Sequence, residues 1–247
     1  MKGAVEISHL QKAFKGPDGR RIPVLNDINI SIPGGQFVCL VGPSGCGKTT
    51  ILHAIAGILQ KDAGTILIDG RDHRAARFGY VFQESRLLNW RTVSENVRFG
   101  AVAAGIDGKE ISSLVNKYTE LVGLGDFKDA YPLSLSGGMQ QRVAIARAFV
   151  VKPDVLLMDE PFSSLDELTA HTMRSELLQF WERERHTVIF ITHNTSEAVY
   201  LADKIYTLGK RGSGITAEFD VEIARPRDIE DPKLIELRKR VLATLHH

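Results

Sequence analysis

The stretch from Phe37 to Leu59 constrains the fold of this chain more than any other. Phe37–Val41 is a continuous apolar run, as expected for a parallel strand that is covered on both faces. It leads into the glycine-rich segment Gly42–Thr49, and an apolar stretch that we expect to be helical, Thr50–Leu59, follows. A strand, a glycine-rich loop and a helix in this order indicate a βαβ arrangement, so the sequence predicts an α/β fold.

The glycine-rich segment has the spacing GxxxxGK[ST] of a phosphate-binding P-loop. Its glycines allow consecutive backbone N–H groups to converge on phosphate oxygens, its lysine supplies charge at the β/γ position, and its threonine hydroxyl is a Mg²⁺ ligand. The residues predicted to bind nucleotide here are Gly42, Pro43, Ser44, Gly45, Cys46, Gly47, Lys48, Thr49 and Thr50.

Further strands and a helix extend the α/β pattern. Buried strands are expected at Val155–Met158 and Val188–Ile191, with a helix from Leu168 to Trp181 as the crossover between them. Another strand should have one solvated face, because three isoleucines alternate with polar residues at Ile28, Ile30 and Ile32.

The stretch of residues 84–150 has a different character, because it contains no strand-like run. Thr92 and Glu95 form a capping-box pattern, and apolar residues from Ile111 to Val122 follow helical spacing. We expect an α-helical insertion here. Near the end of the chain, Asp231-Pro232 is a good start for a last helix.

These patterns give a single domain over residues 1–247 with three parts. The expected core comprises residues 1–83 and 151–215, the helical subdomain residues 84–150, and the C-terminal tail residues 216–247.

Composition excludes several classes of protein. The net charge is +1, from 31 Lys and Arg against 30 Asp and Glu, so the chain lacks the basic footprint of a nucleic-acid binder. The two cysteines have no metal-binding spacing and favour a reducing compartment. No apolar run is long enough to span a membrane, and the first residues do not form a signal peptide.

A second motif follows the buried run Val155–Met158. Asp159 ends this strand and can hold a metal ion, and Glu160 can orient or deprotonate an attacking water. Alone, an apolar strand that ends in acidic residues is a weak signal. Together with the P-loop it identifies a nucleoside triphosphatase.

A third motif lies between the other two. Leu135–Arg142 reads Leu-Ser-Gly-Gly-Met-Gln-Gln-Arg, and it resembles the signature motif of the ATP-binding cassette (ABC) ATPases. Ser136, Gly137 and Gly138 are expected to open a helix, whose free N–H groups and positive dipole end suit an anion. The resemblance implies a P-loop NTPase (ABC ATPase) core with a mainly parallel sheet, an antiparallel β subdomain and an α-helical insertion.

Two polar positions match other motifs of this family. Gln83 resembles the Q-loop glutamine, which joins the sheet to the helical insertion and senses Mg²⁺ and water. Asp166, in Ser164-Leu165-Asp166, resembles the D-loop that crosses between subunits, although Ser164 or Asp166 would also serve as a helix N-cap.

A histidine and a phenylalanine also match positions of this family. His193, after the strand Val188–Thr192, resembles the switch histidine that contacts the γ-phosphate; a lone histidine at a strand end is otherwise usually structural. Phe14 falls where the family has an aromatic residue that stacks on adenine, and the alternative for an isolated phenylalanine is a place in the core.

The resemblance also implies partners. ATP and Mg²⁺ would be bound in an ATP-dependent, head-to-tail homodimer, with each ATP between the P-loop of one chain and Ser136–Gly138 of the other. The chain would be peripheral, at the cytoplasmic face of the inner membrane, bound to integral-membrane permease subunits. A solute-binding protein would take part indirectly, and nucleic acid would not.

Narrower features resemble the importers of nitrate, sulfonate, taurine and related small anions. These features include Arg86–Val97, Glu197–Asp203 and Arg225-Pro226-Arg227. Asn89 stands where that group usually has proline, and Asn194 stands where aspartate is common. These two departures bear on the assignment to this substrate group and not on the assignment as an ATPase. Because the sequence ends soon after its last expected helix, we do not expect the extra regulatory domain of carbohydrate-importer ATPases.

Two other functions are compatible with a nucleotide-binding cassette. A non-transport ABC ATPase that acts on nucleic acid or ribosomes usually has a coiled-coil insertion, zinc-binding cysteines or two cassettes, and this sequence has none of these. A nucleotide-switched binding module with little hydrolysis would not need Glu160 beside Asp159.

The segment after Gln83 is a candidate docking surface. Leu88 and Trp90 lie between Arg86 and Arg91, in a stretch without strand or helix periodicity. An exposed aromatic residue beside arginines is typical of an interface hot spot, so we expect these two residues to receive a short helix of a permease. The alternative is that Trp90 belongs to the core.

Overall fold

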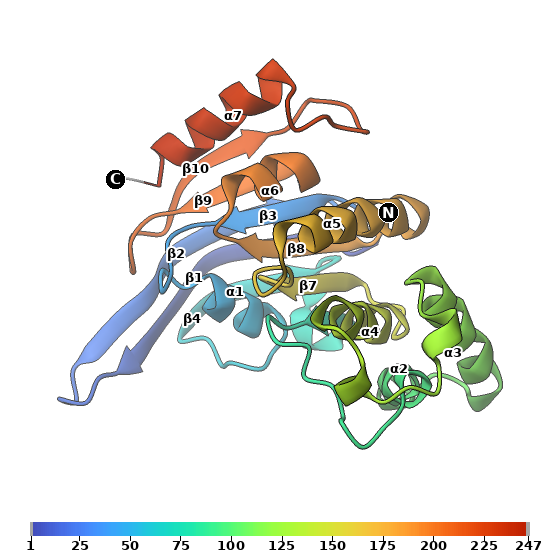
Figure 1. The fold of residues 1–247 in the computed structure, drawn as a ribbon. Coiled ribbons are helices and arrows are strands. Elements are labelled where there is room, and N and C mark those ends of the chain that lie inside the picture. The colour runs from blue at the N-terminus through green and yellow to red at the C-terminus, as the bar shows by residue number, and fades with distance from the viewer. Residues whose placement is uncertain (1, 246–247) are drawn as a thin grey trace. The chain divides into compact units, whose positions relative to one another are not determined.

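The computed structural model describes residues 2–245 (Figure 1), and the chain divides into two compact units. Unit 1 combines the chain up to Ala76 with the chain from Thr187 onward, and unit 2 is Arg77–His186. His246 and His247, whose origin the sequence leaves open, lie outside the described residues.

Unit 1 contains an antiparallel sheet, as the resemblance implied. Its strands lie in the order β2-β1-β4-β5, and β1 pairs antiparallel with both β2 and β4. The three alternating isoleucines of β2 are buried and their neighbours Asn29 and Ser31 are exposed, which confirms the expected one-sided strand. The strands are β1 (Val5–Lys15), β2 (Arg21–Ile32), β4 (Ala63–Ile68) and β5 (Arg71–Asp72).

The same unit contains a mainly parallel group of strands, β3 (Phe37–Val41), β8 (Thr187–Thr192), β9 (Lys204–Leu208) and β10 (Ile215–Asp220). β3 lies between β8 and β9 and runs parallel to both, and β10 pairs antiparallel with β9. Every residue of β3 and β8 is buried. The continuous apolar runs were therefore correctly predicted as strands covered on both faces.

The helices of unit 1 are α1 (Lys48–Ile55), the short 3₁₀ turn η1 (His73–Ala75), α6 (Thr195–Leu201) and α7 (Pro232–Ala243). α1 is shorter than the predicted helix because Gly57, with φ of 71°, ends it before Leu59. Asp231 caps α7 as predicted, since its side chain accepts a hydrogen bond from Lys233 N at 2.8 Å. α6 and α7 pack against each other (Figure 1).

Unit 2 contains two parallel strands and most of the helices. β6 pairs with β7, which is entirely buried, and α2 packs against α3 and α4. The capping box at Thr92 and Glu95 is present at the start of α2. The elements are β6 (Phe78–Val81), β7 (Val155–Asp159), α2 (Val93–Ala103), α3 (Gly108–Leu121), η2 (Gly125–Phe127), η3 (Pro132–Ser134), α4 (Gly137–Phe149) and α5 (Glu167–Glu184).

The expected helical insertion lies wholly within unit 2, and residues 84–150, all of them described, contain no strand. The boundaries of the core, helical subdomain and tail remain predictions. Across residues 2–245, the structure has no helix with the length and apolar character needed to cross a membrane.

Candidate functional site

The P-loop connects β3 to α1 in unit 1, and Gly47 is the N-cap residue of α1 with φ of 114°. An L-residue rarely adopts this backbone conformation, and a Cβ here would lie 2.8 Å from Leu25 Cδ2 and 3.2 Å from Val24 O. Because glycine has no side chain, it gives α1 no side-chain cap. The N–H groups of the first turn are thus suited to an anionic ligand.

Lys48 folds back over this loop. Its side chain is 5% exposed, and its Nζ donates hydrogen bonds to Gly42 O at 2.7 Å and Pro43 O at 3.1 Å. Neutral carbonyl groups are weaker acceptors than phosphate oxygens. The ammonium group is therefore held at the loop by contacts that a bound phosphate can replace.

Phe14 lies on β1 of the same unit and is 42% exposed. It pairs with Ile22 of β2, the strand whose Leu25 limits the space beside Gly47. The core alternative is therefore wrong for this residue. An exposed ring on the sheet beside the P-loop is available for stacking.

His193 follows β8 and is exposed, just before α6. The next residue, Asn194, caps α6, because its Oδ1 accepts hydrogen bonds from Ser196 N at 2.9 Å and Glu197 N at 3.3 Å. Asparagine and aspartate are equally good N-caps. The departure at Asn194 thus preserves the helix start that holds His193.

Asp159 and Glu160 lie at the end of β7 in unit 2. Asp159 is 9% exposed and close to Tyr80, whose pKa is raised well above its usual range by burial and then by the negative charge of Asp159. Glu160 has φ of 43°, which is uncommon for a residue other than glycine. Backbone strain of this kind is concentrated at functional sites, where it directs a side chain.

Gln83 is connected to the loop after Glu160 by a residue that the sequence did not reveal, Ser163. Gln83 Nε2 donates to Ser163 Oγ at 3.2 Å, and Ser163 Oγ donates to Glu160 O at 2.9 Å. The backbone N–H of Ser163 donates to the same carbonyl at 3.2 Å. In the sequence, Ser163 was indicated only by its position three residues after Glu160, a spacing that is typical of a turn.

Ser136–Gly138 open α4, as predicted. Ser136 is the N-cap, with its Oγ accepting from Met139 N at 3.3 Å. A Cβ on Gly138 would lie 2.8 Å from Thr169 Cγ2, whereas one on Gly137 would be 3.9 Å from Leu165 Cδ2. The glycine at 138 is therefore required for close packing, and the glycine at 137 leaves the helix start open.

α4 also holds the segment after Gln83. Gln141 Nε2 donates to Phe82 O at 3.2 Å, and Arg147 donates to Ser85 O at 2.7 Å and Arg86 O at 2.9 Å. The signature helix and the Q-loop are thus one hydrogen-bonded assembly in unit 2.

Asp166 is the N-cap of α5, with its Oδ1 accepting from Thr169 N at 3.0 Å. This resolves the alternative between Ser164 and Asp166 in favour of Asp166. Hydrogen bonds from Thr169 lower the pKa of this exposed carboxyl group. It is therefore ionised at neutral pH.

The predicted site residues are divided between the two units. Unit 1 holds Phe14, the P-loop residues 42–50 and His193; unit 2 holds Gln83, Ser136–Gly138, Asp159, Glu160 and Asp166.

The chemistry of the candidate ligands suits a magnesium ion that is bound together with nucleotide. Among residues 2–245, no group of three or more His, Cys, Asp and Glu side chains is placed to hold a metal ion. Mg²⁺ is usually bound through one or two side-chain oxygens plus phosphates and water. Side-chain oxygens of this kind are present in both units: Thr49 offers one in unit 1, and Asp159 and Gln83 offer others in unit 2.

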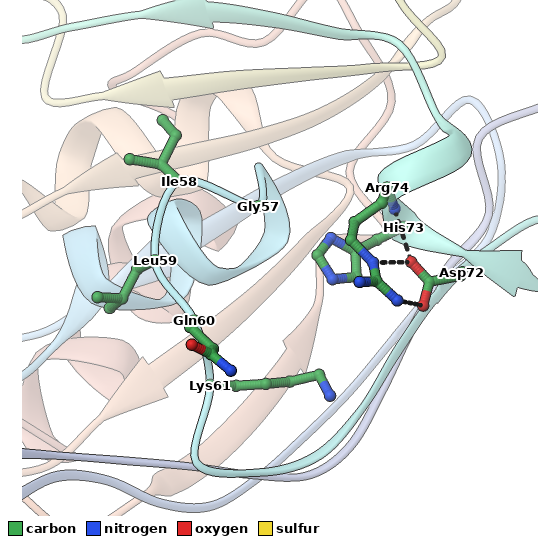
Figure 2. A pocket seen from close by; sticks show the side chains of 8 residues that line it. All are labelled: Gly57, Ile58, Leu59, Gln60, Lys61, Asp72, His73 and Arg74. Atoms are coloured by element: carbon green, nitrogen blue, oxygen red, sulfur yellow. Dashed lines mark hydrogen bonds and ion pairs between the residues drawn. The ribbon is translucent and has the colours of Figure 1, made fainter.

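A separate cavity of about 400 Å³ lies in unit 1 after the C-terminal end of α1 (Figure 2). It is lined by residues 57–61 and 72–74, and no P-loop residue lines it. In the cavity wall, the Arg74 guanidinium donates to the Asp72 carboxylate at 2.8 and 2.9 Å, so these two opposite charges neutralise each other. His73 is buried and bonded to Ile55 O at 2.9 Å, which gives it a structural role.

The strand–P-loop–helix unit, the buried strand ending in Asp159 and the mixed sheets define a P-loop nucleoside triphosphatase. A family model described as ABC transporter matches residues 25–163. The chain belongs to the ABC transporter family, and it is an ATPase of that family.

Individual relatives cover nearly the whole chain. The taurine import ATP-binding protein TauB of Rhizobium johnstonii is 39% identical over 98% of this chain and 96% of its own length. The nitrate import ATP-binding protein NrtD of Synechocystis sp. is 43% identical over 93% of this chain and 86% of its own. A solved dimeric ATP-binding cassette bound to ADP and Pi matches with a TM-score of 0.78 at 29% identity, covering 89% of this chain and 100% of that one.

Proposed function

We propose that this protein is the ATP-hydrolysing subunit of an importer for a small anion such as nitrate, a sulfonate or taurine. It dimerises head to tail, and it couples hydrolysis to uptake through a separate permease. Support comes from relatives named for import of taurine and nitrate, which match over most of this chain and most of their own length. A non-transport ATPase acting on nucleic acid or ribosomes and a nucleotide-switched binding module are not favoured.

Each motif has one part in this function. The backbone N–H groups of Gly42–Thr50 and the Lys48 ammonium bind the phosphates, and Phe14 stacks on adenine. Thr49, Gln83 and Asp159 hold Mg²⁺. Ser136, Gly137 and Gly138 of the other subunit meet the γ-phosphate, with Asp166 at the subunit boundary.

The observation that carries the hydrolytic function is the geometry of Glu160. It follows Asp159 on a buried strand, its backbone is in the left-handed region, and Ser163 fixes its carbonyl. Glu160 accepts a proton from the attacking water, while Gln83 and His193 position water and γ-phosphate.

Glu160→Gln tests this function. The amide can hydrogen-bond water but cannot accept its proton, so ATP binding should persist while turnover falls about 10²–10⁴-fold. Phosphate release and nucleotide titration measure the two quantities, and Glu182→Gln, on the exposed face of α5, is the matched control. Unchanged turnover would refute the assignment. Size-exclusion with ATP should also show the Glu160→Gln variant as a stable dimer.

The permease would dock beside Trp90. This side chain is 72% exposed, so the core alternative is wrong, and Leu88 is half-buried. The backbone around them is held by the buried side chain of Asn96, which bonds Leu88 N at 2.8 Å and Leu88, Arg91 and Thr92 carbonyls at 2.9–3.1 Å. A fixed loop that presents an aromatic side chain is a preorganised docking surface.

Trp90→Ala should weaken capture by detergent-solubilised permease by about 30-fold, because hot-spot truncations cost about 2 kcal/mol. ATP binding and thermal stability should not change. Leu242→Ala removes an exposed apolar residue from α7 and is the control. Undiminished capture of the Trp90 variant would place the interface elsewhere.

The proposed location is peripheral, at the cytoplasmic face of the inner membrane. The permease supplies the spanning helices, a solute-binding protein takes part through the permease, and nucleic acid is not a partner.

A further inference from the structure

The segment Arg225-Pro226-Arg227 of unit 1 is a side-chain clamp on α6. Arg227 is 7% exposed, and its guanidinium group donates hydrogen bonds to main-chain carbonyl oxygens. Three acceptors are at the C-terminal end of α6 and two are in the tail: Val199 (3.1 Å), Tyr200 (3.0 Å), Ala202 (2.6 Å), Ile223 (2.8 Å) and Val221 (3.2 Å).

The three acceptors on α6 are carbonyl groups of the kind that a helix end leaves without an intrahelical partner, and they carry the negative end of the helix dipole. The planar guanidinium has five donors in a fixed fork and so bonds all five carbonyl groups, whereas a lysine has only three donors on one nitrogen. Burial lowers the pKa of Arg227 to about 10, so the group stays charged at neutral pH. The charge on the clamp is therefore the same throughout the neutral pH range.

Arg225 extends the clamp to β3. It forms an ion pair with Asp203 and donates to Leu201 O. Asp203 in turn accepts from Phe37 N at 2.9 Å, and its own N–H donates to Phe37 O at 2.7 Å. The tail thus reaches the first residue of β3, through Asp203, as well as the last turn of α6.

The opposite ends of both elements carry residues of the proposed site. β3 leads into the P-loop at Gly42, and α6 starts directly after His193 and Asn194. α6 has only 7 residues, about 10 Å at 1.5 Å per residue. Arg238 of α7 also donates to Ser196 Oγ in the first turn of α6, at 3.3 Å. The tail therefore holds this short helix at both ends.

We infer that Arg225 and Arg227 are positioning residues for hydrolysis, which fix α6 and through it His193. This rests on the proposed role of His193 at the γ-phosphate. A short helix without its clamp can shift along its axis, and a displacement of about 1 Å can cost about 100-fold in rate. Loss of Arg227 should leave ATP binding by the P-loop intact, since the partners of Arg227 are in α6 and the tail and not in β3.

The test is a double-mutant cycle on the full chain, with Arg227→Lys and His193→Ala. Arg227→Lys should lower kcat about 10- to 100-fold with ATP affinity within about 3-fold of the parent. If Arg227 acts through His193, adding Arg227→Lys to His193→Ala should lower kcat no further. Arg240→Lys, an exposed arginine of α7, is the control and should leave kcat unchanged.

Multiplicative losses in the double variant, or an unchanged kcat in Arg227→Lys, would overturn the inference. An unchanged kcat in His193→Ala would instead overturn the proposed role of His193. Thermal melts check that each variant is folded at the assay temperature. If Arg227→Lys is unfolded at the assay temperature, Arg225→Lys and the exposed Arg238→Ala are each combined with His193→Ala instead. No further loss of kcat in these double variants would support the inference, and multiplicative losses would overturn it.

Discussion

Two helices of this protein, α1 and α4, begin at glycine-rich segments that differ in how they use glycine. At α1, Gly47 has φ of 114° and provides no side-chain cap. At α4, Ser136 caps the helix through its hydroxyl group, and Gly137 and Gly138 are helical residues with ordinary negative φ. The start of α1 depends on an unusual backbone conformation. The start of α4 has an ordinary side-chain cap, followed by two glycines, which have no side chains.

The difference separates two tasks. The P-loop must wrap its backbone around phosphates, and it adds a cation, Lys48, at the same place. The start of α4 has no lysine and needs only to let an anion approach along the helix axis. The first segment is therefore suited to hold a nucleotide alone, and in the proposed dimer the second would complete a site whose nucleotide is bound by the other chain.

The largest expected effect is on Lys48. Lys48→Ala removes the main cation of the P-loop, and the lost charge-assisted hydrogen bonds should weaken ATP binding by about 100-fold or more. Calorimetric titration measures this. Ser136→Ala should leave ATP affinity of the isolated chain unchanged; an equal loss in both variants would end the distinction between the two helix starts.

The sequence predicted the parts of the fold whose cause is local. The capping box at Thr92, the cap at Asp231 and the buried strand Phe37–Val41 each depend on neighbouring residues, and the structure confirms them. The helix after the P-loop was predicted too long because Gly57, which ends it, occurs inside an apolar run.

Features that depend on distant residues were harder to predict. Trp90 is exposed, and its loop is held instead by Asn96, whose side chain bonds the backbone of Leu88 and Arg91 on either side of it. In the sequence, Arg225-Pro226-Arg227 is only a mark of a subfamily. Its clamp is visible only in the structure, because the carbonyl groups of α6 lie 25 to 28 residues earlier in the chain.

A mixing experiment tests whether the two helix starts act on one nucleotide from different chains. Lys48→Ala and Ser136→Arg should each be inactive, the second because it puts a bulky cation where the γ-phosphate must approach. In a 1:1 mixture about half of the dimers are mixed, and each has one of its two sites intact, so about a quarter of the parent activity should return. Phosphate release measures the recovery.

Recovery requires that one intact site can work alone. Cross-linking of Ser136→Cys to the P-loop of the partner, in the presence of ATP, checks the same geometry without hydrolysis. Absence of both recovery and ATP-dependent cross-linking would contradict the shared site.

The smallest chemical change adds one methyl group to each helix start. Gly47→Ala should destabilise the fold by about 2–4 kcal/mol, because alanine is strained at a φ of 114° and its Cβ would meet Leu25 at 2.8 Å. Gly137→Ala should change stability by less than about 0.5 kcal/mol, because alanine is a good helix residue and its Cβ would be 3.9 Å from Leu165. Chemical denaturation measures both. The two variants should also differ in activity. In the proposed dimer the methyl group of Gly137→Ala would lie where the γ-phosphate of the partner's nucleotide approaches, so this variant, although as stable as the parent, should lose ATPase turnover by about 10-fold. Normal turnover in Gly137→Ala would show that the start of α4 does not touch nucleotide, and an unchanged stability in Gly47→Ala would show that the P-loop does not depend on glycine conformation.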